Sequence, residues 1–405
     1  MLAGVRNFFS RNFEALFETI PGQIPSLDGL RSIAIVAVIA SHVKVDFLFA
    51  GGVANPSWWF NDVVSWFWIG VDLFFVMSGF LIGRILFTEY KKTGNLNLGA
   101  FLLKRGFRIW PLYFFICTVS LLLITHSHGF PHWTKVVPDY LFLANYFGEN
   151  LAFGSWSLSI EEQFYILASG FLFLSRKWVK GAERIVFVLA LVLLAEPIIR
   201  NIMWDHFIVT GMDPVLLERD IIHNYIISHC DGIVMGLILA SVMVFLKPTK
   251  KVEKRVTLSL IGATVVTALL ASFYRIAFLY SFIAAIFGLV VWFCLAKPGH
   301  PVTRFLSWKP FQILSRLSYG MYLWYRFPLW KIARVVMDHF PNSSSIVQYG
   351  IIYGITFGFS VFASTGTFIL VERPFLEWRA KKYAKGDKKS VQGVPVVARS
   401  ANALG

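Results

Sequence analysis

The stretch LDGLRSIAIVAVIASH, residues 27–42, places ionisable side chains in an apolar segment, with Asp28 and Arg31 near its start and His42 at its end. Arg31 and His42 are eleven residues apart, close to three helical turns, so in a helix they share one face about 16 Å apart along the axis. Ionisable groups are expensive in hydrocarbon and usually functional there. The spacing predicts a functional row of ionisable side chains along one helix face. At one end of this row lies an imidazole, which is a common general base. The alternative is an Arg31 that reaches lipid headgroups and a hydrogen-bonded core histidine.

A second cationic pair lies in FLLKRGFRIWPLYF, residues 101–114. Arg105 and Arg108 are one helical turn apart, and Lys104 is adjacent. Two guanidinium groups at this spacing form a fork suited to phosphate. The alternative is the ordinary basic flank of a membrane helix.

Six further ionisable residues are expected near the depth of His42, if about 1.5 Å of rise per residue is counted from the expected helix ends. They are Asp72, Glu161, Glu162, Glu196, Asp231 and Arg326. We expect a polar site there, with one carboxylate orienting or tuning the imidazole. Each acid taken alone also fits a capping or packing role, and Trp156, Trp324 and Tyr325 at similar depth also fit an interfacial aromatic belt.

The elements that position these residues are predicted to be membrane helices. Hydrophobic residues make up 56% of the 405-residue chain and charged residues 15%, with a mean hydropathy of +0.62, which is typical of a polytopic membrane protein. We predict an all-α bundle of about ten transmembrane helices, each near the length that spans the hydrocarbon core. The apolar runs are 31–50, 67–87, 108–125, 157–175, 185–204, 222–246, 256–273, 277–296, 311–336 and 346–371.

The net charge of +15 is interpreted as topology and not as a nucleic-acid surface. Basic residues collect in alternate loops and in the tail, so the positive-inside rule places both termini in the cytoplasm. We expect a cytoplasmic segment 1–24, a transmembrane domain 25–375 and a basic, disordered tail 376–405.

Cysteine and histidine patterns indicate no disulfide or metal site. Cys117, Cys230 and Cys294 fall in or beside apolar segments without a paired framework. The stretch HSHGFPHW, residues 126–133, has three histidines in a loop without a carboxylate, which is weak evidence for zinc. We expect buried cysteines and a solvated loop.

Six stretches occur in the order expected of the acyltransferase-3 family of integral membrane O-acyltransferases, which the chain resembles over about residues 25–375. The stretches are LDGLRSIAIVAVIASH, GVDLFFVMSGFLIG, FLLKRGFRIWPLYF, GSWSLSIEEQFYIL, LSYGMYLWYRFPL and VERPF. The resemblance implies about ten membrane helices and transfer of an acyl group, often acetyl, from cytoplasmic acyl-CoA to a hydroxyl of an extracytoplasmic acceptor, commonly a glycan.

The family motifs map onto particular residues of this chain. An Arg-x10-His motif falls on Arg31 and His42, an Arg-x-x-Arg motif on Arg105 and Arg108, and a Glu-Arg-Pro motif on residues 372–374. We expect the CoA phosphates to bind at Arg105 and Arg108, with Arg31 as a further contact, and His42 to act as general base. The supporting or acceptor-side residues are expected to be Asp72, Ser78, Trp156, Glu161, Glu162, Tyr165, Asp231, Tyr325, Arg326 and Glu372.

Details of the mechanism stay open at this point. Asp28 is expected beside Arg31 as an ion-pair partner, and an acyl-enzyme on a serine or on His42 is an alternative to direct transfer. Acyl-CoA, with acetyl expected, is the donor substrate; no tightly bound cofactor and no metal are expected. The expected partners are a glycan or lipid-linked glycan and membrane lipids, in a bacterial inner membrane, and the oligomeric state is left open.

The chain departs from the family pattern at two places. The family usually has histidine after the Leu-Trp pair, whereas this chain has Tyr325 and then Arg326 after Leu323 and Trp324. The family often has arginine two residues before the aspartate, whereas this chain has His229 before Asp231. Both changes affect the expected acceptor side more than the acyl transfer. Some family members append a secreted esterase-like domain; we expect none here, with the membrane part completing the transfer.

Two rival classes are considered. Buried histidine, arginine and carboxylates also mark proton-coupled transporters and exporters, and a non-catalytic membrane sensor or scaffold is a third interpretation. Uptake driven by a proton gradient without acyl-CoA would favour the transporter. Phenotypes unaffected by substitution of His42 and Arg105 would favour the sensor.

Overall fold

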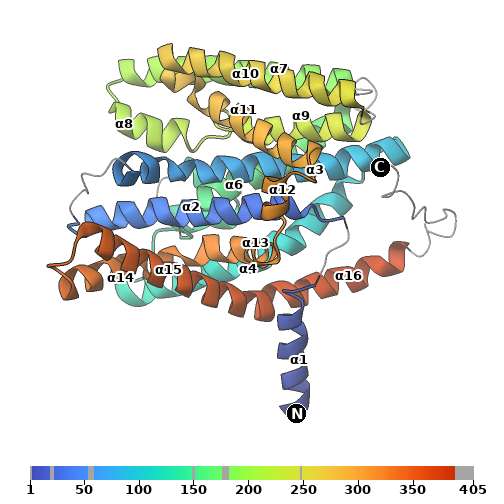
Figure 1. Cartoon of the computed structure of the whole chain (residues 1–405). Coiled ribbons are helices and arrows are strands. Elements are labelled where there is room, and N and C mark those ends of the chain that lie inside the picture. The colour runs from blue at the N-terminus through green and yellow to red at the C-terminus, as the bar shows by residue number, and fades with distance from the viewer. Residues whose placement is uncertain are drawn as a thin grey trace.

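The computed structural model describes residues 2–18, 22–52, 59–147, 151–175, 182–246 and 249–387. These described residues form helices and connecting segments without a strand (Figure 1), as the all-α prediction requires. The helices are α1 (Leu2–Glu14), α2 (Pro25–Phe49), α3 (Gly70–Thr93), α4 (Leu98–His128), α5 (Trp133–Tyr140), α6 (Ser155–Ser175), α7 (Ala182–Val209), α8 (Pro214–Leu216), α9 (Asp231–Phe245), α10 (Lys250–Phe273), α11 (Arg275–Ala296), α12 (Pro301–Leu306), α13 (Lys309–Trp324), α14 (Arg326–His339), α15 (Ser345–Thr367) and α16 (Arg373–Asp387). Short 3-10 or π-helical turns cover Trp59–Val63, Val64–Ile69, Ala144–Tyr146, Leu217–Ile222 and Phe368–Glu372.

Seven helices in the described part are long and apolar enough to cross a membrane. They coincide with the predicted runs 31–50, 67–87, 108–125, 185–204, 256–273, 277–296 and 346–371. The other three predicted runs fall on α6, on the shorter apolar helix α9 and on the pair α13 and α14. The count of ten and the cytoplasmic position of both termini therefore stay predictions.

Two predicted runs differ from the helices that form. Run 311–336 is divided at Tyr325, where α13 ends and α14 begins. Run 222–246 begins too early, because α9 starts only at Asp231. Ser228 holds the preceding segment in a turn by donating to the carbonyl oxygens of Ile222 and Tyr225. Hydropathy detects the apolar residues in both runs, but neither the hydrogen bonds of Ser228 nor the missing backbone N–H of Pro328.

The predicted tail begins as a helix and not as a disordered chain. α16 continues to Asp387 and packs through Trp378, whose ring centroid lies 4.8 Å from that of Phe107 in α4. Glu377 of α16 also pairs with Arg11 of α1 at 2.9 Å. Residues 376–387 are thus helical, and the rest of the predicted tail lies outside the described residues.

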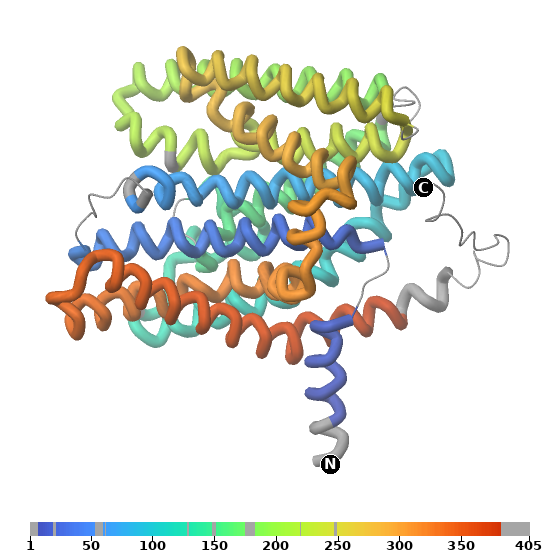
Figure 2. Tube along the Cα trace, viewed as in Figure 1, coloured from blue at the N-terminus to red at the C-terminus, as the bar shows by residue number. Residues whose placement is uncertain are grey.

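The long helices run side by side, and α1 projects across their direction (Figure 2). α2 is held in the middle of the bundle by bonds to two neighbours. Ser32 donates to the carbonyl oxygen of Phe311 in α13 at 2.6 Å, and Tyr349 of α15 donates to that of Ala40 at 3.0 Å. Pro25 begins α2 at a position where its missing N–H costs nothing. These contacts fix the helix that presents Arg31 and His42.

Glycines allow α3 and α9 to approach closely. A Cβ atom at Gly79 of α3 would collide with the backbone carbonyl of Ile233, and one at Gly236 of α9 would collide with that of Val76. Small residues at helix contacts let backbones pack tightly in membranes. The pair brings Asp72 and Ser78 of α3 into register with the start of α9.

Candidate functional site

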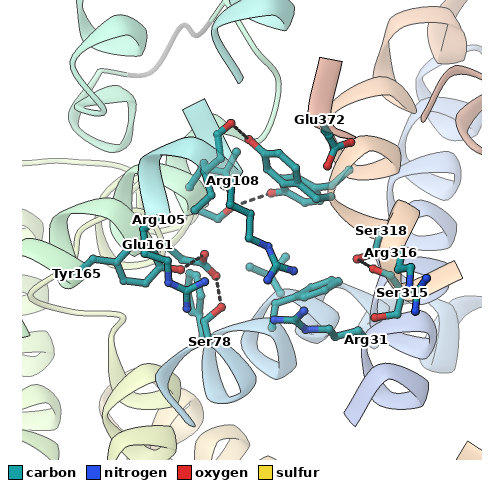
Figure 3. A pocket seen from close by; sticks show the side chains of 18 residues that line it. Arg31, Ser78, Arg105, Arg108, Glu161, Tyr165, Ser315, Arg316, Ser318 and Glu372 are labelled. Atoms are coloured by element: carbon teal, nitrogen blue, oxygen red, sulfur yellow. Dashed lines mark hydrogen bonds between the residues drawn. The ribbon is translucent and has the colours of Figure 1, made fainter. Parts of the chain in front are cut away.

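Four arginines from three helices line one cavity of about 120 Å³ (Figure 3). The cations are Arg31 of α2, Arg105 and Arg108 of α4, and Arg316 of α13, and the carboxylates are Glu161 of α6 and Glu372 of the turn Phe368–Glu372. The structure thus brings together the two arginine motifs that lie more than seventy residues apart in the sequence. We name this space the arginine cavity.

Three of these guanidinium groups lack protein partners in the described part of the chain. Arg31, Arg105 and Arg108 make no hydrogen bond or ion pair there, and the Nε atoms of Arg31 and Arg105 are buried without a hydrogen-bond acceptor. Arg105 instead lies over the ring of Tyr165, 5.3 Å from its centroid. Guanidinium nitrogens shielded from water are usually paired, which makes the buried Nε atoms of Arg31 and Arg105 exceptions, whereas the Arg108 side chain is exposed. Three unpaired ones around a cavity make a site for an anion that offers several oxygen atoms, such as phosphate.

The remaining polar groups of the arginine cavity are held in place by the helices. Glu161 accepts hydrogen bonds from Ser78 at 2.8 Å and from Tyr165 at 2.6 Å. Arg316 is held by the carbonyl oxygen of Ala15 at 2.7 Å. Glu372 is buried, and its Oε1 atom has no hydrogen-bond donor among the described residues. The cavity therefore contains a fixed carboxylate, an anchored cation and one carboxylate available to a ligand.

Asp28 is placed differently from the expected ion pair. Its oxygen atoms accept hydrogen bonds from Gln23 and, at 3.1 Å, from Ser315. Arg31 lies three residues further along α2, yet in the described structure it makes no ion pair with Asp28. The described structure does not bring the two side chains within ion-pair distance, and their pairing stays a prediction. Asp28 tethers the start of α2 to α13, and Ser315 also lines the arginine cavity.

His42 lies outside the lining of the arginine cavity, further along α2. Its Nδ1 atom is 2.9 Å from the carbonyl oxygen of Val38, and because a carbonyl oxygen only accepts, Nδ1 carries the hydrogen. Nε2 then has the free lone pair that a general base needs, and it bonds to no described residue. The half-buried ring contacts Phe153 at 5.3 Å and Tyr325 at 5.5 Å between centroids.

Two tyrosines connect the arginine cavity to His42. Tyr322 lines the cavity, and its ring centroid lies 6.2 Å from that of Tyr325, which in turn contacts His42. The arginine cavity and the imidazole are thus neighbouring compartments along α2, in the order that the helical spacing predicts.

The carboxylates expected around His42 have other partners. Asp72 pairs with His229 at 2.7 Å, Glu162 accepts from the indole of Trp110 at 3.2 Å, and Asp231 pairs with Arg200 at 2.7 Å. Glu161 belongs to the arginine cavity. Among the described residues, the backbone of Val38 and not a carboxylate fixes the tautomer of His42. The prediction of an orienting carboxylate is therefore wrong for these four acids.

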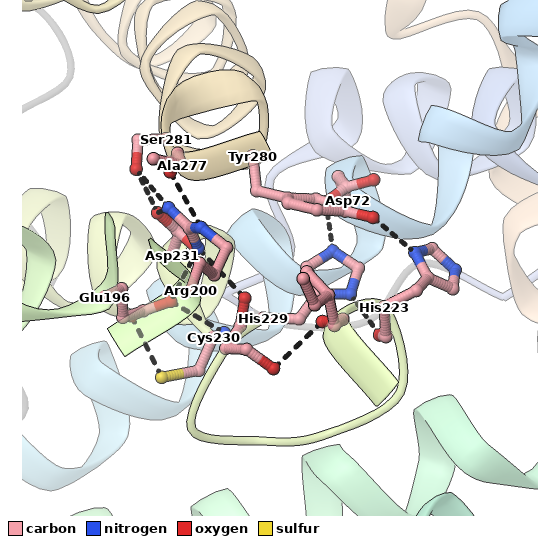
Figure 4. A network of polar contacts seen from close by, with 12 residues as sticks. Asp72, Glu196, Arg200, His223, His229, Cys230, Asp231, Ala277, Tyr280 and Ser281 are labelled. Carbon is pink, nitrogen blue, oxygen red and sulfur yellow. Dashed lines mark hydrogen bonds and ion pairs between the residues drawn. The ribbon is translucent and has the colours of Figure 1, made fainter. Parts of the chain in front are cut away.

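Two of those acids, Asp72 and Asp231, belong with Glu196 to a separate buried network between α3, α7, α9 and α11 (Figure 4). Arg200 bonds Asp231, Ser281 and the carbonyl oxygen of Ala277, while Glu196 accepts from the backbone N–H of Cys230 at 3.1 Å. His229 faces Asp72 with Nε2 and the carbonyl oxygen of His223 with Nδ1. Both ring nitrogens of His229 thus face oxygen atoms, and these two contacts tie the turn before α9 to α3.

Arg326 pairs with a carboxylate that sequence reasoning missed. Its guanidinium contacts Asp46, which is buried and lies four residues after His42 on the same face of α2. Arg326 also lies over the ring of Phe153, 4.3 Å from its centroid. The i, i+4 spacing of His42 and Asp46 is the signal that would have identified Asp46.

Other site residues also went unrecognised. Arg316 lies within a predicted apolar run, and Arg200 follows Glu196 by one helical turn. Arg31 was identified because an ionisable residue in an apolar segment is usually functional, and the same rule applies to Arg316 and Arg200. Tyr322 gave no such signal, since tyrosine is ordinary in membrane helices. Trp156 packs on His223, with 4.5 Å between the ring centroids.

The three cysteines are free and buried. In the loop expected to be solvated, His132 caps the start of α5, where its Nδ1 lies 3.0 Å from the hydroxyl of Thr134. The side chain of His128 lies outside the described residues.

Comparison with known proteins gives the class of the chain. A family model described as an acyltransferase domain matches residues 24–365, and the chain belongs to this family. Together with the seven long apolar helices, membership makes the chain an integral, multi-pass membrane protein. The predicted resemblance is confirmed.

Curated relatives point to the same class. The chain is 26% identical over 347 residues to the peptidoglycan O-acetyltransferase OatA of Listeria monocytogenes, covering 78% of this chain and 50% of that protein. It is 27% identical over 332 residues to the O-acetyltransferase OatA of Staphylococcus aureus, covering 75% of this chain and 50% of the relative. The chain thus spans about half the length of these relatives. A comparison with solved structures gave no significant match.

Proposed function

We propose that the chain is a membrane O-acyltransferase that moves an acyl group, acetyl in the simplest case, from cytoplasmic acyl-CoA to a hydroxyl of an extracytoplasmic glycan. The main support is the arginine cavity, where Arg31, Arg105 and Arg108 surround a space without carboxylate partners of their own among the described residues. A polyanionic donor fits that charge, and the family and the names of the relatives fit acyl transfer.

In this mechanism the CoA phosphates bind the guanidinium groups of the arginine cavity. Bidentate arginine contacts to phosphate supply both charge and orientation. Arg31 and His42 are separated by about 16 Å of helix, and the flexible pantetheine arm would bridge that interval past Tyr322. The thioester carbonyl would then lie beside His42.

His42 acts as general base at this carbonyl. Nε2 takes the proton from the acceptor hydroxyl as its oxygen forms a bond to the thioester carbon. The tetrahedral intermediate collapses when the carbon–sulfur bond breaks. The CoA thiolate leaves with the electron pair and takes the proton back from the imidazolium. An ester and free CoA are formed, and the enzyme returns to its initial state.

For the acceptor we propose a sugar hydroxyl of a cell-envelope glycan, at the outer face of a bacterial inner membrane. Support comes from the relatives, one of which is named for the O-acetylation of peptidoglycan. Lipid-linked glycans present the same hydroxyl chemistry and belong to the same proposal. Mass spectrometry of envelope glycans from a deletion strain would identify the modified sugar.

The donor site is tested by CoA binding to the purified full chain in nanodiscs. Each arginine contact to phosphate is a charge-assisted hydrogen bond worth about 1.5–3 kcal/mol, so Arg105→Ala or Arg108→Ala is expected to weaken CoA binding about tenfold or more. Isothermal titration with acetyl-CoA measures the change.

Arg304→Ala is the matched control, because Arg304 is an exposed arginine of α12 outside the cavity lining. It is expected to bind acetyl-CoA as the unmodified chain does. If all three variants retained the original affinity, the arginine cavity would not be the donor site.

A further inference from the structure

The hydroxyl of Tyr325 is buried without a partner among the described residues. Tyr325 is 0% exposed, and its Oη atom makes no hydrogen bond within the described part of the chain. A buried hydroxyl without a hydrogen-bond partner is destabilising, and such exceptions need an explanation. A phenylalanine at position 325 would not bury an unsatisfied hydroxyl, so we expect the hydroxyl of Tyr325 to have a function.

The position of this hydroxyl is fixed relative to His42 by the break between α13 and α14. Tyr325 occupies the break, and the next residue, Arg326, pairs with Asp46 on the α2 face that bears His42. Arg326 also covers Phe153, whose ring packs on the edge of the His42 imidazole. One ion pair and one aromatic ring therefore clamp the break against the helix of the proposed base.

A second tyrosine shows that the neighbourhood does supply hydrogen-bond partners. The hydroxyl of Tyr322, one turn earlier, lies 2.7 Å from that of Ser157 and donates to the carbonyl oxygen of Gly154 at 3.1 Å. Tyr325 lies between Tyr322, which lines the arginine cavity, and His42, with ring centroids 6.2 and 5.5 Å away. The ring that bears the unpartnered hydroxyl thus lies between the donor cavity and the base.

We propose that Tyr325 is a catalytic residue whose hydroxyl donates a hydrogen bond to the thioester carbonyl oxygen as it becomes an oxyanion. The inference rests on the proposed function. His42 handles the proton of the acceptor, whereas Tyr325 stabilises the negative charge of the tetrahedral intermediate and keeps its own proton throughout. A fixed donor in a dry site favours the transition state because it needs no reorganisation. The missing partner in the ligand-free chain is then the substrate oxygen.

Tyr325→Phe tests the proposal, since it removes only the hydroxyl. Loss of one oxyanion donor typically lowers kcat about a hundredfold to a thousandfold, and we expect this loss for acetyl transfer with unchanged acetyl-CoA affinity. Because the hydroxyl has no protein partner among the described residues, the thermal unfolding midpoint should stay the same or rise.

Tyr113→Phe is the matched control. Tyr113 is also 0% exposed, but its hydroxyl bonds Asp139 at 3.0 and 3.1 Å. This variant is expected to lower the unfolding midpoint while the folded fraction keeps its kcat. The two buried tyrosines thus have opposite expected profiles, which a general packing effect would not produce.

Fluorinated tyrosines incorporated at position 325 add a readout specific to hydrogen bonding. They lower the pKa of the phenol at nearly constant shape, so kcat is expected to change systematically with donor acidity. Full kcat in Tyr325→Phe, or a kcat independent of fluorination, would overturn the inference while acetyl transfer by the unmodified chain still stood. Absence of transfer by the unmodified chain would instead overturn the proposed function.

Discussion

His42 is the residue on which the proposed proton transfer depends. The contact between its Nδ1 and Val38 leaves Nε2 as the basic nitrogen, and the ring lies between Phe153 and Tyr325. The tautomer is set by the helix backbone and so does not require a carboxylate partner. The base is therefore expected to be neutral before it accepts the proton of the acceptor.

Replacing His42 with glutamine removes the base and keeps similar bulk. General-base catalysis typically contributes about 10²–10⁴-fold, so His42→Gln is expected to lower kcat in that range. Acetyl-CoA affinity should not change, because His42 lies outside the arginine cavity. Transfer assays with labelled acetyl-CoA, combined with binding titrations, separate the two effects.

His339→Gln is the control for this substitution. His339 makes the same helical contact, from Nδ1 to the carbonyl oxygen of Val335 at 2.8 Å, but it is exposed on α14. Its replacement should leave kcat unaltered. Equal activity of both variants would exclude His42 as the base.

At the residue scale the sequence predicted the cations better than the acids. Arg31, Arg105 and Arg108 were identified by type and spacing, and the structure places them around one cavity. The acids were grouped by depth alone, and depth along a helix does not say which neighbouring helix a side chain faces. Asp72 therefore faces His229 and not His42.

At the scale of elements, the contact between α3 and α9 depends on glycine. A Cβ atom at Gly79 would meet the backbone of α9, which has no side chain to move away. Overpacking of this kind typically costs about 1–3 kcal/mol. Gly79→Ala is thus expected to lower the thermal unfolding midpoint in detergent.

Gly262→Ala provides the comparison within another helix. No described atom lies within 4 Å of the position that a methyl group at Gly262 of α10 would occupy. Alanine favours a helix over glycine by about 0.5–1 kcal/mol, so the unfolding midpoint of this variant should hold or rise. A Gly79→Ala variant as stable as Gly262→Ala would mean that α3 and α9 are not packed as described.

Helices with a long apolar run were predictable, and interrupted ones were not. Seven runs match long helices because composition alone sets them. The division at Tyr325 has a local signal in Pro328, which has no N–H to bond the carbonyl oxygen of Trp324, where α13 ends. The Arg326–Asp46 pair, a tertiary contact that hydropathy does not show, holds α14 against α2.

At the scale of the whole molecule, the arrangement has a direction. The arginine cavity and His42 follow one another along α2, so the proposed donor and acceptor approach from opposite sides of the membrane. The basic loops indicate which side is cytoplasmic by the positive-inside rule. The side assignment is a prediction from the distribution of charge, and the transfer is a prediction of the proposed mechanism.

Transfer across a sealed bilayer is the most direct test of this account. Proteoliposomes would be prepared with labelled acetyl-CoA on one side and glycan acceptor on the other, and the orientation of the chain would be determined by labelling its basic tail. We predict labelled ester on the acceptor only when acetyl-CoA is on the side of the tail, and none with His42→Gln. Ester formation with acetyl-CoA on the opposite side, or at an undiminished rate in His42→Gln, would contradict the account.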